Sequence, residues 1–152
     1  MKRVVIESPL SGPDREKNKF YARLCVLDCL RRNEAPYASH LLYDHAGILD
    51  DDKPEERRLG MEAGFAWGAQ AQLVAVYADL GISKGMREGI GQALLHGIPW
   101  EERRLPEALM GRFRARYPVQ AAAVPVLVES RCRDCGAVLS APTCFLCGGG
   151  PG

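Results

Sequence analysis

The chain of 152 residues lacks the features that would place it outside the class of soluble globular proteins. No stretch approaches the roughly 18 consecutive apolar residues that a membrane-spanning helix needs. The formal net charge is only +1 at pH 7, so bulk positive charge does not supply a nucleic-acid-binding surface. The apolar run from Val4 stops at Glu7, too early for a secretory signal, so we expect a cytoplasmic protein. The 47% hydrophobic and 26% charged residues that are present indicate a folded domain.

Cysteine is sparse except near the C-terminal end, where four of the six cysteines form two Cys-x-x-Cys-Gly motifs at 132–136 and 144–148. Each tight motif can place two thiolates on one side of a tetrahedral zinc ion. With all four ligands from protein, the ion has no open position for water and is structural. The alternatives are two redox dithiols or free thiols. The motifs predict a minimal zinc ribbon at residues 131–152 with the ligands Cys132, Cys135, Cys144 and Cys147.

Residues 1–118 alternate between short β-branched runs and helical patterns. We predict strands at 4–6, 35–43, 73–77 and 99–103. We predict helices at 14–33, where Asp14 is expected to cap the first turn, at 54–70, from the loop 79–86 to Gly97, and at 105–118. The order β-α-β-α-β-α-β predicts an α/β fold with a parallel sheet, right-handed crossovers and helices on both faces. Residues 119–130 are predicted to be a linker that runs into a strand. Cys25 and Cys29, four residues apart on the first helix, are expected to pack as small hydrophobic side chains.

Three loops at 8–14, 40–54 and 79–88 are predicted to form one rim, because each follows a strand of a parallel sheet at its carboxyl end. Ligands of such sheets bind beyond this edge. The loop after the first strand contains Ser8 and Gly12, which suit a phosphate or a sugar hydroxyl at a helix N-terminus. An ordinary strand-to-helix turn has the same composition. His40 is placed to hydrogen-bond a base or a ribose, although a lone histidine more often packs in the core.

The loop before the third long helix is richer in small residues, which let the backbone approach a ligand closely. Asp79 stands where a strand would deliver a carboxylate, and its alternative role is to cap the turn. The candidate substrate-binding residues of this loop are Gly81, Ser83, Gly85 and Met86.

The stretches 6–13, 73–79 and 83–93 resemble the nucleoside 2-deoxyribosyltransferase-like superfamily, nearest to a branch found in bacteria and their phages. The resemblance covers residues 3–104 with the elements in the same order. It implies a flavodoxin- or Rossmann-like α/β fold with a site at the strand ends. It also implies cleavage of a nucleoside N-glycosidic bond and a homo-oligomer whose pockets borrow residues from a neighbouring subunit. Asp79 matches the aspartate that protonates or holds the base, and Ser83 and Gly85 match the turn of small residues.

The nucleophile of that superfamily is a glutamate on the helix after the third strand, which attacks the anomeric carbon. When the pattern is aligned on Gly85, Gly91 and Ala93, Gly89 occupies the glutamate position. Glu88 is the adjacent residue, and one step along a helix rotates a side chain by about 100°. This chain therefore departs from the pattern at the residue that performs the chemistry.

Other acids can substitute for the missing glutamate, and we take Glu88 and Glu62 with Asp79 as the candidate catalytic residues. Glu62 lies among small residues on the second long helix, and its alternative role is to pair with Arg57 or Arg58. Glu7 is a further acid near the end of the first strand.

The sequence thus leads to three functional hypotheses. The first is a nucleoside- or nucleotide-binding protein with a deoxyribosyltransferase- or N-glycosidase-like pocket that cleaves an N-glycosidic bond. The second is a non-catalytic binder of nucleotides or nucleotide signals, which senses or sequesters them. The third, a zinc ribbon that contacts nucleic acid or protein from an α/β scaffold, is the least favoured, because the tail carries little charge besides Arg131 and Arg133. We expect a homo-oligomer, formed through the second and third long helices, and no membrane association.

Overall fold

Four parallel strands form one sheet in the order β2-β1-β3-β4. They are β1 (Lys2–Glu7), β2 (Glu34–Tyr37), β3 (Leu73–Tyr77) and β4 (Trp100–Arg103) in this computed structural model. The helices are α1 (Arg15–Arg31), α2 (Ser39–Leu42), α3 (Pro54–Gly68), α4 (Lys84–Leu95) and α5 (Glu107–Arg116). The structure describes residues 1–118. The predicted linker at 119–130 and the predicted zinc ligands Cys132, Cys135, Cys144 and Cys147 lie outside the described residues.

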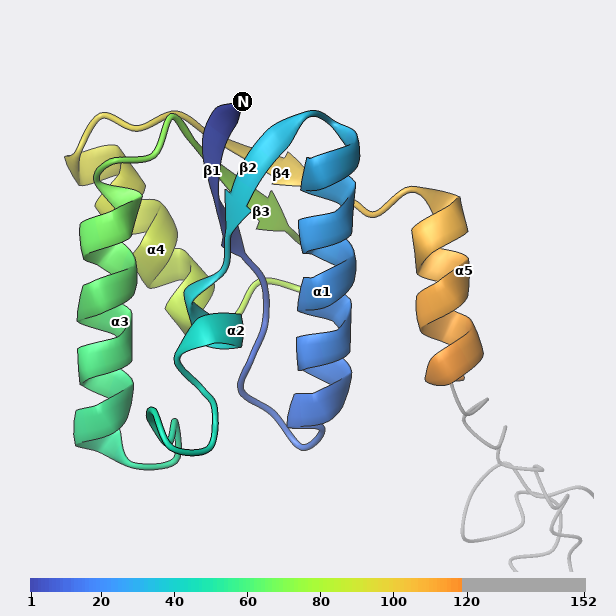
Figure 1. Cartoon of the computed structure of the whole chain (residues 1–152), viewed down its shortest axis with the longest axis horizontal. Helices are drawn as coiled ribbons and strands as arrows, with labels where there is room; N and C mark the ends of the chain where they lie inside the picture. The colour runs from blue at the N-terminus through green and yellow to red at the C-terminus, as the bar shows by residue number, and fades with distance from the viewer. Residues whose placement is uncertain (119–152) are drawn as a thin grey trace, which may run out of the picture. The chain divides into compact units, whose positions relative to one another are not determined.

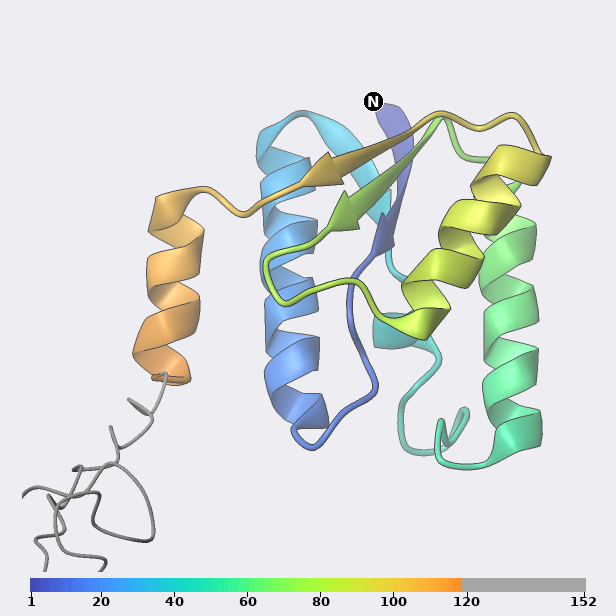
Figure 2. The ribbon, with the colours of Figure 1, turned by 180° about the vertical axis from the view of Figure 1, so that it is seen from behind.

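Helices cover both faces of the sheet, as predicted: α1 and α5 lie on one side, and α3 and α4 on the other (Figures 1 and 2). The alternation of side chains along each strand decides this division. Val4 and Ile6 of β1 pack in the core beneath α1 and α5, whereas Val5 packs with Met86 and Ala93 of α4. The buried strand β3 contributes side chains to both cores, which explains its unbroken apolar sequence.

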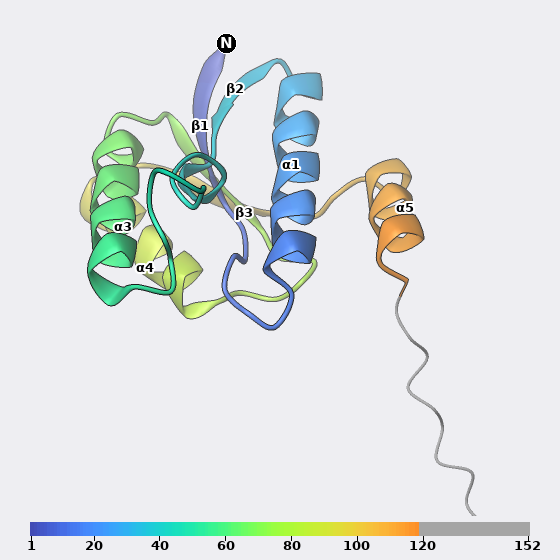
Figure 3. The ribbon, with the colours of Figure 1, turned by 60° about the horizontal axis from the view of Figure 1, so that its bottom comes forward.

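The sheet contains a switch point between β1 and β3. From β1 the chain passes over one face to β2 at the sheet edge, and from β3 it passes over the other face to β4. Connections that leave in opposite directions open a crevice at the carboxyl ends of the two central strands. Figure 3 turns this edge toward the viewer, with α2 and the start of α4 around it.

The predicted strand at 35–43 is wrong in its second half. Pairing between β1 and β2 ends at Val5 and Tyr37, and residues Ser39–Leu42 form the short helix α2 instead. β2 is an edge strand with one neighbour, so nothing holds the chain extended beyond that pair. Ser39 packs against Gly64 of α3, where an added Cβ would lie 3.0 Å from the Ser39 Oγ atom. Tertiary packing between α2 and α3 therefore decides the conformation of a segment that reads as extended.

The helix boundaries follow local capping chemistry. The Asp14 carboxylate accepts a hydrogen bond of 2.9 Å from the Lys17 amide and begins α1, as predicted. Just beyond that helix, Asn33 has a φ of 58°, a left-handed conformation that asparagine tolerates better than most residues. Ser83 begins α4 by accepting a hydrogen bond of 3.3 Å from the Met86 amide.

A buried ion pair ties the two edge strands to the α1 side of the sheet. The guanidinium of Arg103 on β4 donates two hydrogen bonds of 2.7 Å to the Glu34 carboxylate on β2. The same guanidinium lies 3.4 Å from the Cys29 sulfur, and the Tyr77 hydroxyl donates to Asp28 at 2.7 Å. None of these side chains lines the cavity beyond the carboxyl ends of β1 and β3, so the network has a structural role.

Cys25 and Cys29 are fully buried among apolar side chains, which confirms the prediction that they pack in the core. Burial raises the pKa of the Cys29 thiol to about 11. Within residues 1–118, no cluster of histidine, cysteine or acidic side chains could hold a metal ion. The described helices include none that is long and apolar enough to cross a membrane.

Candidate functional site

A cavity of about 100 Å³ lies at the switch point, beyond the carboxyl ends of β1 and β3. Its wall is built from the end of β1 and the loop after it, from α2 and the loop that follows, from α3, and from the start of α4. The predicted rim is therefore confirmed in its geometry, because all three predicted loops contribute residues.

Glu7 is the last residue of β1, and its carboxyl group lines this cavity. Its side chain points to the α3 and α4 face because it follows Val5 by two positions along the strand. Burial raises the pKa of the Glu7 carboxyl from 4.5 to about 8, since the surrounding protein offers its charged form no compensation. No side chain of residues 1–118 donates a hydrogen bond to it or forms an ion pair with it.

The carboxyl of Glu7 lies against the backbone of α4 at Gly89. A Cβ atom built on Gly89 would lie 2.2 Å from Glu7 Oε1 and 2.5 Å from Glu7 Cδ, well inside van der Waals contact. Only glycine at position 89 leaves room for the acid in this place. The carboxyl also borders a second cavity of about 20 Å³ between α3 and α4, together with Gln92 and His96.

Ser8 and His40 form a hydrogen-bonded pair beside Glu7. The Ser8 hydroxyl lies 2.9 Å from Nε2 of His40, and both side chains line the cavity. Burial lowers the pKa of His40 to about 4, with a further lowering from the Lys19 charge and an opposing effect of Asp44. The imidazole is therefore neutral near pH 7, so it can hold the serine hydroxyl in one orientation and is too weak a base to activate it.

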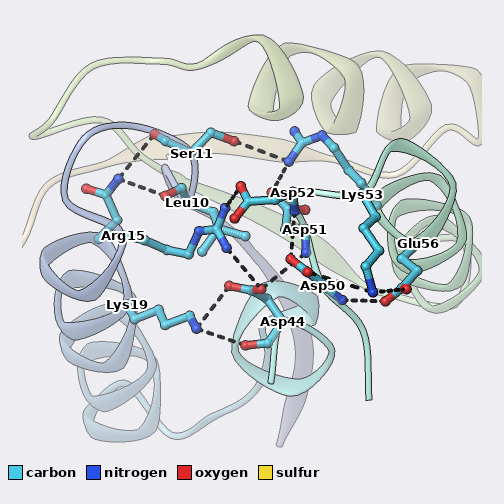
Figure 4. A network of polar contacts seen from close by, with 12 residues as sticks. Leu10, Ser11, Arg15, Lys19, Asp44, Asp50, Asp51, Asp52, Lys53 and Glu56 are labelled. Atoms are coloured by element: carbon cyan, nitrogen blue, oxygen red, sulfur yellow. Dashed lines mark hydrogen bonds and ion pairs between the residues drawn. The ribbon is translucent and has the colours of Figure 1, made fainter. Parts of the chain in front are cut away.

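Several charged residues of the cavity lining belong to a network of polar contacts (Figure 4). The Arg57 guanidinium donates to Asp51 and, at 3.2 Å, to the Ser11 hydroxyl, which joins α3 to the loop after β1. Lys19 of α1 pairs with Asp44 at 2.9 Å. The pKa of Asp51 is raised because its burial outweighs the attraction of Arg57. Two acids of the cavity lining, Asp44 and Asp51, are thus held in ion pairs with Lys19 and Arg57.

Part of the cavity lining is apolar. Leu10, Met61, Phe65 and Met86 line it, and Gly60 brings the backbone of α3 close to Leu49. A cavity that combines apolar side chains with a few oriented polar groups is typical of sites for small organic ligands.

The predicted substrate-binding residues divide into two groups. Ser8, His40, Ser83, Gly85 and Met86 line the cavity together. Gly12 and Gly81 do not line it. Their φ values of 142° and 85° lie in the left-handed region that favours glycine, so the structure shows their part in the turns.

The three predicted catalytic acids lie outside the cavity lining. Glu62 is exposed on α3 and pairs with Arg58 at 2.6 Å, which is the alternative role considered for it. Glu88 is exposed on α4, 3.9 Å from Lys84. Asp79 accepts hydrogen bonds of 2.6 Å from the Tyr21 hydroxyl and 3.0 Å from the Leu105 amide. A catalytic role for these acids stays a prediction, and the cavity offers it no support.

The sequence pointed to Glu7 only as an acid near a strand end, and it did not select Asp51 or Phe65. The signal for Glu7 was present in the alternation of β1, since it continues the Val5 face of the strand. Asp51 and Phe65 carried no comparable signal, because the loop after α2 and the rotation of α3 follow from packing between distant segments. Trp67 of α3 lies outside the cavity lining, is 58% exposed and packs on Tyr37 with ring centroids 5.6 Å apart.

The described fold is similar to that of solved proteins, and the sequence matches one family. A 2-deoxyribosyltransferase from the psychrotolerant bacterium Bacillus psychrosaccharolyticus is similar in structure, with a TM-score of 0.50 and 13% identity, over 67% of this chain and 72% of that one. A conserved protein from Enterococcus faecalis V583 has a TM-score of 0.46 and 19% identity, over 67% and 62%. The first of these likenesses shows a shared fold. No curated protein sequence matches the chain. Residues 2–103 match the family described as a domain of unknown function, DUF7768, and the chain belongs to that family.

Proposed function

We propose that the cavity binds a nucleoside or nucleotide and that the protein cleaves its N-glycosidic bond. The observation that carries this proposal is the cavity at the switch point, whose lining combines the half-buried carboxyl group of Glu7 with apolar side chains and a set of oriented polar groups. The fold shared with a 2-deoxyribosyltransferase supports the same assignment.

The apolar and polar parts of the lining suit the two halves of a nucleoside. Phe65, Met61 and Met86 offer apolar contacts to a planar base. The Ser8 hydroxyl, fixed by His40, and the Arg57 guanidinium offer hydrogen bonds to sugar hydroxyls. The ligand would then lie with its glycosidic bond near the Glu7 carboxyl.

A second function, binding without cleavage, is favoured by one specific observation. Gly89 stands at the position of the superfamily nucleophile, so α4 supplies no acid to the cavity from that position. A protein that kept the pocket and lost the reaction would act as a sensor or would sequester its ligand.

A binding and cleavage assay with a panel of deoxynucleosides, nucleotides and NAD tests the proposal. Titration calorimetry measures binding, and chromatography measures the base that is released. Arg57→Gln should weaken binding by about 10-fold, because a hydrogen bond to a charged group is lost. Arg58→Gln is the matched control, since Arg58 is exposed and lies outside the cavity lining.

Each result decides between the alternatives. Release of base by the wild-type protein supports cleavage, and tight binding without release supports the non-catalytic function. Absence of binding to every member of the panel would refute both. An Arg58→Gln variant that weakens binding as much as Arg57→Gln would show that the ligand binds elsewhere.

A further inference from the structure

Four acidic side chains line the cavity, and three of them are neutralised by cations. Asp44 pairs with Lys19 at 2.9 Å, Asp51 with Arg57, and Glu56 with Lys53 at 2.9 Å. Glu7 has no cation within ion-pair distance among residues 1–118. An isolated buried carboxylate is costly, so the group takes up a proton instead of remaining charged. Glu7 is therefore the one acid of the four that can hold a proton and donate it.

The position of this donor depends on Gly89. The Glu7 carboxyl occupies the space in which any side chain at position 89 would begin, as the 2.2 Å distance from the added Cβ to Oε1 shows. The Glu7 carboxyl of β1 thus packs against the backbone of α4, where Gly89 has no side chain to displace it. The acid and the glycine form one structural unit from two elements that are distant in sequence.

We propose that Glu7 is the catalytic general acid of this protein and that it protonates the departing base, with Gly89 as the residue that makes room for it. The inference rests on the proposed N-glycosidic cleavage and names the group that would assist it. It differs from nucleophilic attack by an acid on the helix, because a neutral carboxyl gives a proton and does not attack carbon.

The step balances without a further reagent. The bond between the anomeric carbon and the base nitrogen breaks, its electron pair stays with the base, and the base takes the proton from the Glu7 carboxyl. A water molecule adds to the anomeric carbon and loses a proton to solvent. Glu7 regains a proton from solvent after the products leave. The products are the free base and the free sugar, and nothing is oxidised or reduced.

Competing acids are poorly placed for this role. Glu62 and Glu88 are exposed and lie outside the cavity lining. Each pairs with a cation on its own helix, Glu62 with Arg58 and Glu88 with Lys84. The burial that raises the pKa of Glu7 to about 8 keeps it protonated at neutral pH, which supports the assignment.

Glu7→Gln tests the acid directly, because glutamine keeps the shape and neutrality of the protonated carboxyl but has no proton to give. We expect base release to fall by about 100-fold or more, with nucleoside binding kept. Glu55→Gln, which changes an exposed acid of α3, is the matched control and should release base at the wild-type rate. The wild-type rate should fall above pH 8, where Glu7 loses its proton, whereas the residual rate of Glu7→Gln should not.

Gly89→Ala tests the geometry, because the new methyl group would displace the carboxyl. Gly91→Ala is its control on the same helix, since an added Cβ at Gly91 meets no atom within 4 Å. We expect Gly89→Ala to lose base release and Gly91→Ala to retain it, with both proteins folded by circular dichroism.

The outcomes separate this inference from the proposed function. Cleavage that survives in Glu7→Gln, or that is lost in Glu62→Gln or Glu88→Gln instead, would overturn the assignment to Glu7 and leave the proposed function standing. Wild-type protein that binds nucleosides without releasing base would also overturn it, because there would be no reaction to assist. Failure of the wild-type protein to bind any nucleoside would refute the proposed function itself.

Discussion

The hydroxyl of Ser8 and Nε2 of His40 lie 2.9 Å apart, and this contact joins the end of β1 to the helix α2 across the candidate site. The pair fixes two groups that the sequence separates by 32 positions. Because His40 is neutral and buried, the contact orients a hydroxyl without adding charge to the cavity.

Removal of this contact should destabilise the fold. Ser8→Ala leaves the buried Nε2 of His40 without its partner, which costs about 1–3 kcal/mol of unfolding free energy. Ser11→Ala removes only an exposed 3.2 Å hydrogen bond from Arg57, which keeps its pair with Asp51, and should change stability by less than about 0.5 kcal/mol. Urea unfolding followed by circular dichroism measures both, and equal losses would contradict a specific role for the pair.

His40 should make the protein less stable in acid. Its pKa is about 4 when folded and 6.5 when free, so the unfolded chain binds more protons as the pH falls from 6.5 to 4. Stability that is present above pH 6.5 should be lost over this range, by at most about 1.4 kcal/mol per pH unit. His40→Gln should remove that loss. An unfolding free energy whose acid dependence is the same in both proteins would show that His40 titrates normally.

Glu7 should make the protein less stable as the pH rises, which is opposite to the effect of His40. Its folded pKa of about 8 lies above the unfolded value of 4.5, so its contribution to stability is complete below pH 4.5 and is lost as the pH rises to 8. Relative to Glu7→Gln, the wild-type protein should lose at most about 1.4 kcal/mol per pH unit between these values. Thermal unfolding of both proteins at a series of pH values measures the difference. Parallel curves would mean that Glu7 is ionised in the folded state.

The buried Arg103–Glu34 ion pair should contribute far more to the free energy of unfolding than the exposed Arg104–Glu102 pair. Arg103→Met leaves the buried Glu34 carboxylate uncompensated, and the expected loss is about 3–5 kcal/mol. Arg104→Met breaks an exposed pair with Glu102 and should cost less than about 1 kcal/mol. Urea unfolding compares the two variants, and a small loss in Arg103→Met would show that the pair contributes little.

The zinc prediction is tested on the full chain by elemental analysis. We expect one zinc ion for each chain after purification without added metal, held by Cys132, Cys135, Cys144 and Cys147. Replacement of Cys132 and Cys144 by serine should abolish it, whereas Cys25→Ser should not, since Cys25 is buried in the α/β core. A wild-type protein that contains no zinc and has four titratable thiols in this segment would disprove the prediction.

The sequence by itself determined the elements whose signals are local. The alternation of β-branched runs and helices predicted the parallel α/β fold, the Asp14 cap marked the start of α1, and an unbroken apolar run marked β3. These features depend on hydrogen bonds and burial within a few residues or on one repeating pattern. The shared rim followed from the same reasoning, because parallel strands bring their carboxyl ends to one edge.

The tertiary structure alone decided which acid lies in the cavity without a cation partner. Glu7 and Gly89 belong to elements separated by most of the domain, and the space that one fills and the other leaves empty exists only after β1 and α4 pack together. The helical α2 segment depended on the same kind of contact, between Ser39 and Gly64. A residue pattern records what each element prefers, whereas the burial that keeps Glu7 protonated is a property of the assembled domain.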